Sequence, residues 1–296
     1  MSTAARAAGG RARAAGERRA VWLVVPALAL LGMFLLLPYL NIVVMSLREP
    51  ALGAPHGPGF TLGNYRRVLG DAYYLGVLGQ TLWLALKTTV ICLALGYPVA
   101  RHLARTDSRF KGVLYVFVLS PLLVGVVVRS FGWLILLSNN GVVNKALIDL
   151  GLVDGALALM NNALGVTIAL VHVFLPFMIL PLVGTLQSVD PTLEAAARSL
   201  GASGLTAFRR IELPLAWPGI QAGVILVFVL ALSAYVTPVM LGGAQVKTMS
   251  VLVVQALIDN FQWPAGAALA LVLAATGALA VWLFARGSAR LMRSVE

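Results

Sequence analysis

The chain has 296 residues, of which 60% are hydrophobic and only 11% are charged, and its mean hydropathy is +0.91. Soluble domains carry roughly a quarter charged residues, so this composition excludes an ordinary soluble protein and indicates a membrane protein. The formal net charge is +11. The positions of the basic residues decide whether that charge reflects a nucleic-acid partner or membrane topology.

Six apolar runs are long enough to cross a membrane as helices, each of which needs ~20 mostly apolar residues. No alternating strand pattern accompanies them, so an all-α integral membrane protein is predicted. The first run is too long for a signal-peptide core and is interpreted as a retained anchor. The predicted spans are Val21–Leu47, Val77–Ala100, Val113–Leu137, Ala163–Leu186, Ile220–Leu241 and Trp263–Ala285.

The basic residues divide the connecting segments into two sets. Fifteen of the 22 lie in the two terminal tails and in the loops 101–112 and 187–219, whereas five lie in the alternate loops 48–76, 138–162 and 242–262. Cytoplasmic loops carry the excess of Lys and Arg, so both termini and the segment 187–219 are predicted to be cytoplasmic. The surplus charge then reflects topology, which argues against nucleic-acid binding.

These patterns divide the chain into four segments. Residues 1–20 form an Ala, Gly and Arg-rich cytoplasmic tail without apolar periodicity, which is expected to be disordered. Residues 21–76 hold the first span and an extracytoplasmic lead-in, and residues 77–285 hold the other five spans. Residues 286–296 form a second cytoplasmic tail.

The cytoplasmic segment 187–219, the insert, contains signals for two short helices. Asp190 suits an N-cap because Pro follows it at the first helical position. Gly201 is placed to end that helix, and Ser203 is placed to cap a second one. Pro214 is expected to end the second helix. The insert is therefore predicted to be two short helices joined at a glycine.

One face of the first helix is apolar, because Leu193, Ala196, Ala197 and Leu200 follow helical spacing. Together with neighbouring small residues, this face suits the cleft of another protein. An amphipathic loop resting on lipid headgroups is the alternative that the pattern leaves open.

The insert resembles the EAA loop of permease subunits in bacterial binding-protein-dependent ABC importers. The matching residues are Glu194-Ala195-Ala196, Gly201 and Ile211-Glu212-Leu213-Pro214. Glu194 lies seven residues before Gly201, whereas six is usual in that family, so the Glu194 carboxylate departs from the pattern. The resemblance implies a coupling-helix region that binds an ATPase, through Glu194, Ala195, Ala196, Leu200, Gly201, Ala202, Ser203 and Phe208.

Further stretches resemble the spermidine/putrescine-type members of this family, namely FTLGNYRRVL (60–69), LGYPVA (95–100), VVVRSFGWLILLSNNGVVN (126–144) and SAYVTPVMLGG (233–243). The resemblance implies a type I importer permease fold in the bacterial inner membrane, with 77–285 as its transmembrane domain. It also implies a second related permease, two ATPase copies, a periplasmic solute-binding protein and a polyamine solute. No GxxxxGK[ST] phosphate loop is present, so the chain is expected not to be an enzyme, and ATP and Mg are expected on the partner ATPase.

Five residues are candidates for the solute pathway. Arg129 and Lys87 are cations inside spans, where such residues usually face a bundle or a water path. The alternative for Arg129 is snorkelling to the outer headgroups, and the alternative for Trp133 is an interface-belt or packing aromatic. Tyr235 and Pro238 suggest a local helix break that frees backbone carbonyls, or else a simple kink.

The charges weaken a polyamine assignment, because none of the eleven acids lies inside a predicted span. An anionic or amino-acid-like solute of the same importer class is therefore the alternative. An ion-coupled secondary transporter is the alternative of another class, although it usually needs intramembrane carboxylates or inverted repeats. The three histidines show no metal-ligand spacing, and Cys92 is expected to be a buried apolar side chain.

Overall fold

Helices make up nearly all of the regular structure in the computed structural model, which describes residues 25–26, 29–51 and 53–293. The predicted tail 1–20 lies outside the described residues. A first helix, Ala29–Ser46, is followed by α2 (Gly63–Gly70), α3 (Ala72–Arg105), α4 (Lys111–Leu123), α5 (Val126–Leu137), α6 (Val142–Asp149), α7 (Ala163–Ser188), α8 (Pro191–Ser199), α9 (Gly204–Ala207), the π-helical segment η1 (Phe208–Glu212), α10 (Leu213–Leu232), α11 (Val236–Gly242), α12 (Met249–Val254), the π-helical segment η2 (Gln255–Asp259) and α13 (Trp263–Arg293).

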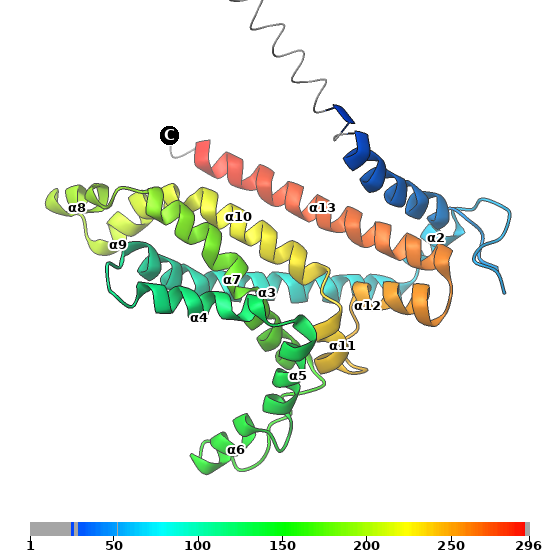
Figure 1. Ribbon diagram of the computed structural model, residues 1–296, viewed down its shortest axis with the longest axis horizontal. Coiled ribbons are helices and arrows are strands. Elements are labelled where there is room, and N and C mark those ends of the chain that lie inside the picture. The colour runs from blue at the N-terminus through cyan, green and yellow to red at the C-terminus, as the bar shows by residue number, and fades with distance from the viewer. Residues whose placement is uncertain (1–24, 27–28, 52, 294–296) are drawn as a thin grey trace, which may run out of the picture.

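Among the described residues, six helical segments are long and apolar enough to cross a membrane, as the hydropathy predicts. The long helices α3, α7, α10 and α13 run alongside one another as a bundle (Figure 1). Several of them extend beyond the predicted bounds, since α3 reaches Arg105 and α13 reaches Arg293. The all-α membrane fold is therefore confirmed.

The centre of the bundle is α7, which packs between α3 and α10 through very small side chains. A Cβ atom on Gly223 of α10 would lie 2.7 Å from the Met178 Sδ atom of α7, and one on Gly96 of α3 would lie 3.1 Å from Met178 Cγ. Small residues let helix backbones approach closely where no hydrophobic effect drives association in lipid. Met178 itself is fully buried. These contacts hold α3, α7 and α10 together as one unit.

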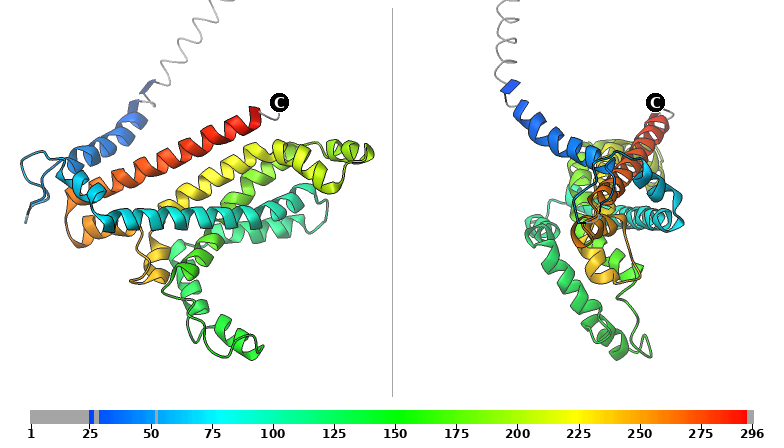
Figure 2. Two further views of the ribbon diagram at one scale, coloured as in Figure 1. Left: turned by 180° about the vertical axis from the view of Figure 1, so that it is seen from behind. Right: turned by 90° about the vertical axis from the view of Figure 1, so that its right-hand side faces the viewer.

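The third predicted span, Val113–Leu137, is wrong as a single helix. Helix α4 ends at Leu123, Val124 is extended, Gly125 is non-helical, and α5 begins at Val126 in a new direction. Pro121 lies just before the break, and proline removes one backbone hydrogen bond from the helix that contains it. Beyond the break, α5 and α6 project away from the bundle (Figures 1 and 2).

The fifth predicted span, Ile220–Leu241, also has wrong bounds. The helical run starts at Gly204, passes through Pro214 without interruption and ends at Leu232. The chain then breaks at Ser233–Tyr235 before α11 begins. The break indicated by Tyr235 and Pro238 is therefore present, but it ends the span nine residues earlier than the hydropathy suggests.

Three segments that the charge count places together also lie together in the fold. The turn between α3 and α4, the helices α8 and α9, and the C-terminal end of α13 all lie toward one end of the bundle (Figure 1). Helices α2 and α12 lie at the opposite end. The basic segments among the described residues thus lie toward one end of the bundle, as the charge count predicts.

Candidate functional site

The insert forms the two short helices that its capping residues predict. The Asp190 carboxylate accepts a hydrogen bond of 2.8 Å from the Thr192 backbone N–H at the start of α8. This hydrogen bond holds the pKa of Asp190 below its ordinary value. Gly201 has a φ angle of +89°, a left-handed conformation that glycine adopts without strain. Ser203 caps α9 by accepting from the Thr206 N–H. All three capping predictions are confirmed.

The end of the second helix differs from the prediction, because Pro214 does not stop it. The Leu213 N–H bonds to the Phe208 carbonyl, which makes a π turn over Phe208–Glu212. A π turn widens the helix and offsets its hydrogen bonds by one residue, which accommodates a proline directly afterwards. Helix α9 is therefore joined through η1 to α10, and the insert is continuous with a membrane span.

Three leucine side chains of the insert are exposed at the surface of the chain. Leu200 is 89% exposed, and Leu193 and Leu205 are also exposed. Among the other residues implied in ATPase coupling, Ala195, Ala196, Gly201 and Ser203 are exposed, whereas Glu194, Ala202 and Phe208 are half-buried. We call Leu193, Leu200 and Leu205 the leucine surface. Exposed apolar side chains on a short helical hairpin are typical of a docking surface.

The inner side of the insert is held to α3 by a charged network around Arg101. Arg101 Nε donates to both carboxylate oxygens of Glu212, each at 2.9 Å, and Arg101 Nη2 lies 3.2 Å from Glu194 Oε2. Tyr97, one helical turn earlier on α3, donates its hydroxyl to Glu212 Oε1 at 2.8 Å. The first and last helical turns of the insert are therefore linked through one guanidinium.

Two further contacts complete this attachment. Arg105 Nη1 donates to the Val189 carbonyl at 2.8 Å, where the chain leaves α7. The Phe208 ring packs edge-on against Tyr97 with 5.6 Å between the ring centroids. Phe208 therefore lies against this chain's own helix α3, on the inner side of the insert.

Glu212 is the most constrained member of this network, because its side chain is 1% exposed. A buried carboxylate is costly unless charges or hydrogen bonds compensate it. Arg101 and Tyr97 supply that compensation, while Arg101 and Glu194 themselves remain 42% and 23% exposed. The contact of Arg101 with Glu212 is thus short and involves a buried carboxylate, whereas its contact with Glu194 is longer and joins two partly exposed side chains.

A second polar group lies where the two broken spans meet. The Ser130 hydroxyl of α5 and the Thr237 hydroxyl of α11 are both buried and lie 3.1 Å apart. One turn further along α5, Trp133 Nε1 donates to His172 Nδ1 of α7 at 3.1 Å. Trp133 is therefore packed against and hydrogen-bonded to another helix of this chain, as the packing alternative expects.

The place where α5 and α11 meet is called the crossing below. Arg129, which precedes Ser130 on α5, lies beside it. Its Nε and Nη1 atoms are buried, and no acceptor among the described residues bonds to them. Tyr235 precedes α11 and is partly exposed, whereas Pro238 is buried within α11. The carbonyl of Ala234, in the break, accepts a hydrogen bond from Ser250. The structure thus places Arg129, Trp133, Tyr235 and Pro238 around one crossing of α5 and α11.

Lys87 is not part of that group. Its ammonium lies 5.8 Å from the ring centroid of Trp83, one turn earlier on α3, and Trp83 is exposed on the outside of the helix. Among the described residues, no hydrogen bond or ion pair joins Lys87 to the crossing. A cation over an aromatic face is a sufficient account of its position.

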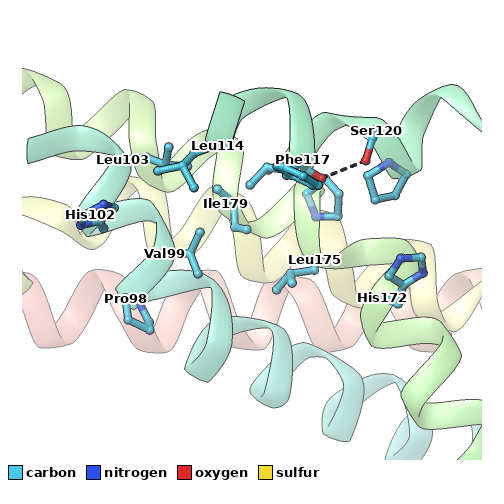
Figure 3. A pocket seen from close by; sticks show the side chains of 13 residues that line it. Pro98, Val99, His102, Leu103, Leu114, Phe117, Ser120, His172, Leu175 and Ile179 are labelled. Carbon is cyan, nitrogen blue, oxygen red and sulfur yellow. Dashed lines mark hydrogen bonds between the residues drawn. The ribbon is translucent and has the colours of Figure 1, made fainter. Parts of the chain in front are cut away.

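An apolar groove of about 680 Å³ lies between α3, α4 and α7 (Figure 3). His172 marks one end of the groove and His102 marks the other, toward the insert. Leucine, valine, phenylalanine and proline side chains line most of the wall between them, with Ser120 as a polar exception. The groove thus connects the neighbourhood of the crossing with the end of α3 that contacts the insert.

Four members of these two groups are not indicated by any local sequence pattern, namely Tyr97, Arg101, Glu212 and His172. Arg101 and Arg105 contribute to the topology prediction only as basic residues of the loop 101–112. Their spacing of four residues also places them on one helix face. Glu212 occupies the variable place of an Ile-x-Leu-Pro pattern, and it lies within a helical run that continues into a span. The sequence signal for this contact is therefore an acid, Glu212, within one helical run, together with two arginines, Arg101 and Arg105, at the end of another.

Six helices long enough to span a membrane, the breaks after α4 and α10, and a helical insert at one end define the class of this molecule as a multi-pass membrane transport protein. The chain belongs to the family of binding-protein-dependent transport system inner membrane components, whose model matches residues 92–293. The predicted family and membrane location are therefore confirmed.

Relatives in this family are similar along nearly the whole chain. The spermidine/putrescine transport system permease protein PotB of Escherichia coli (strain K12) is 34% identical over 274 residues, covering 93% of this chain and 99% of the relative. A protein of the same name from Haemophilus influenzae is 31% identical over 267 residues, covering 89% and 92%.

Two solved structures share the fold at low sequence identity. A chain of a bacterial ABC transporter involved in the import of the acidic polysaccharide alginate superimposes with a TM-score of 0.77 at 16% identity, covering 94% of this chain and 99% of that one. A chain of the MetNI methionine ABC transporter gives 0.55 at 14% identity, covering 76% and 99%. The type I importer fold is therefore confirmed.

Proposed function

We propose that this chain is one permease subunit of an ATP-driven importer and forms half of the path for a polyamine such as putrescine or spermidine. Relatives that carry the spermidine/putrescine permease name align over nearly the full chain, which supports the solute class. The proposed assembly contains a second related permease, two ATPase copies that bind ATP and Mg, and a periplasmic solute-binding protein. A solved structure with a similar fold contains a periplasmic protein, which supports that kind of partner.

The leucine surface carries the proposal for the ATPase side. It is exposed, it lies on two capped helices, and α8 and η1 on either side of α9 are attached to α3 by ion pairs on their inner side. A partner that binds there displaces α8 and α9, and η1 transmits the displacement directly to α10. We assign this surface, with Ala195, Ala196, Gly201 and Ser203, to the ATPase contact and place it with both termini in the cytoplasm.

The crossing of α5 and α11 is the proposed solute path. Broken helices expose backbone groups near the membrane centre, where transporters bind solute. Arg129, Trp133 and Tyr235 lie there, with His172 as an additional member, whereas Pro238 shapes α11 from within. Lys87, which lies against Trp83 on α3 and away from the crossing, remains a separate candidate for the path.

One observation favours a second candidate solute. Arg129 is a cation at the crossing, and no carboxylate of the described residues pairs with it. A cation without a partner repels a polyamine and attracts a carboxylate or phosphate at short range. An anionic or amino-acid-like solute, carried by the same kind of importer, is therefore the second candidate.

The test uses the chain co-expressed with its ATPase, second permease and binding protein, reconstituted in proteoliposomes. We expect uptake of labelled putrescine or spermidine that requires ATP and the binding protein. Unlabelled polyamine should compete, whereas an amino acid should not. Competition by an anion or amino acid instead would favour the second candidate.

The matched variant is Leu200→Asp combined with Leu205→Asp, which places charges on the leucine surface without altering a buried contact. We expect the variant to insert normally and to lose the ATPase on purification. Asp107→Asn, in the exposed turn after α3, is the control and should retain it. Solute uptake by the purified chain alone under an ion gradient, with no ATPase present, would instead support a secondary transporter.

A further inference from the structure

The guanidinium of Arg101 bonds to two carboxylates that lie at opposite ends of the insert. Its Nε contacts Glu212 in η1, and its Nη2 contacts Glu194 in α8. These two acids are eighteen positions apart and lie on separate helices of the insert. No other arginine or lysine among the described residues forms an ion pair in this chain. Arg101 is therefore the one charged link between α3, α8 and η1.

The two contacts differ in burial and in length. The Glu212 contact uses both carboxylate oxygens at 2.9 Å, and Glu212 is 1% exposed. The Glu194 contact is 3.2 Å long between two partly exposed side chains. Partly exposed ion pairs are weak, whereas breaking a buried pair is expensive. The first contact is thus fixed, and the second can open and close at little cost.

We propose that Arg101 is a positioning residue that holds α8 against α3 through Glu194 while Glu212 keeps the guanidinium in place. This inference rests on the proposed function of the insert as the ATPase contact. Opening of the Glu194 contact lets α8 move with the ATPase, and closing returns α8 to α3. Glu194 therefore acts within this chain, on the side opposite the leucine surface.

Arginine suits this role because its planar fork presents separate N–H groups to two partners at once. Lysine has a single compact ammonium and cannot span both carboxylates in this geometry. In Arg101→Lys the ammonium is expected to stay with the buried Glu212, where loss of charge is most costly. Arg101→Lys should therefore remove only the Glu194 contact, as Glu194→Gln does from the other side.

The first experiment measures the position of α8 in the full chain in nanodiscs. Spin labels are placed at Leu193→Cys on α8 and His102→Cys on α3, both exposed, while the buried Cys92 stays unlabelled. We expect Glu194→Gln and Arg101→Lys each to lower the population at the short distance about two- to fivefold, the effect of one partly exposed ion pair. The double variant should show the same change as either single variant, because all three remove one contact.

The second experiment measures ATP hydrolysed per solute imported in the reconstituted assembly. We expect the same three variants to raise this ratio about two- to fivefold while the ATPase stays bound. Arg109→Lys and Asp107→Asn, exposed charges in the adjacent turn, should leave it unchanged. A ratio that stays at the wild-type value in Glu194→Gln, or changes that add up in the double variant, would overturn the proposal.

These outcomes separate this inference from the proposed function. If the wild-type chain never binds an ATPase, the proposed function fails, while the spin-label distances still report whether Arg101 positions α8. If the ATPase binds but the distances do not respond to Glu194→Gln, only the positioning role fails.

Discussion

The two polar regions of this molecule, the insert with its Arg101 network and the crossing of α5 and α11, differ in whether their charged side chains are paired within the chain. At the insert, Arg101 pairs with the carboxylates of Glu194 and Glu212, and Glu212 also accepts from the Tyr97 hydroxyl, so the charges of these three ionised side chains are paired within the chain. At the crossing of α5 and α11, the hydroxyls and the indole have partners, but two nitrogens of Arg129 have none among the described residues. The network around Arg101 is thus paired within this chain, although the neighbouring Arg105 keeps one buried Nε atom without a partner among the described residues, whereas Arg129 is not paired with any acid of those residues.

This difference separates structural charges from functional ones. A satisfied buried network stabilises a fixed arrangement, and removal of one member leaves another buried without compensation. An unsatisfied cation contributes no such pairing, and it is retained at a cost to the fold. The comparison therefore predicts that stability depends on Arg101, whereas Arg129 affects transport more than stability.

The largest expected effect is the loss of Arg101. Arg101→Ala leaves the buried Glu212 carboxylate with only Tyr97, which should destabilise the chain by about 3 kcal/mol. Glu212→Gln should cost about 1 kcal/mol, because the partly exposed Arg101 keeps water and Glu194. Arg129→Met should be neutral or stabilising. Thermal unfolding midpoints of the purified chain in detergent give the order.

Equal losses for Arg101→Ala and Arg129→Met would contradict the contrast between the two regions. His102→Ala serves as a control for truncation at the same end of α3, since His102 is exposed. It should leave the unfolding midpoint near that of the wild-type chain.

A smaller effect is expected at the crossing itself, from the buried pair Ser130 and Thr237. Ser130→Ala leaves the Thr237 hydroxyl buried without a partner, which should cost about 1–2 kcal/mol. Combining it with Thr237→Val removes both hydroxyls, so the double variant should cost less than the sum of the two single variants. A double-mutant cycle on unfolding midpoints measures this coupling. Additive losses would show that the two hydroxyls are independent.

The sequence predicts those features of each region that depend on residues close together in the chain, and it does not predict contacts between residues far apart in the chain. The caps at Asp190, Gly201 and Ser203 depend on residues within a few positions, so local rules were sufficient. The pairing of Arg101 with Glu212 joins residues 111 positions apart and depends on how α3 packs beside α10. No local pattern contains that information, and the departure of Glu194 from the family spacing gave no indication of its partner.

The spans show the same limit. Hydropathy detects the length of apolar segments and therefore predicts six spans. It does not indicate where the chain changes direction within such a segment. The break between α4 and α5 follows Pro121, yet Pro176 and Pro181 lie within α7, which continues to Ser188. A proline interrupts a helix only where neighbouring elements support the altered path. The unbroken helix at Pro214 is the converse case.

The smallest expected effect concerns pH at the entrance of the insert, where Asp190 is fully exposed. Its pKa in the folded chain is lowered from 3.8, because the Thr192 N–H stabilises the carboxylate. The ionised Asp190 carboxylate stabilises the helix fully when the pH is above the pKa of this group in the unfolded chain. This contribution is lost as the pH falls through the pKa of the group in the folded chain. Fraying of α8, measured by the mobility of a spin label at Leu193→Cys, should therefore increase only at pH below about 4. Asp190→Asn keeps the cap without a titratable group, so its mobility should not change over that range, and a wild-type response centred near neutral pH would assign the effect to another group.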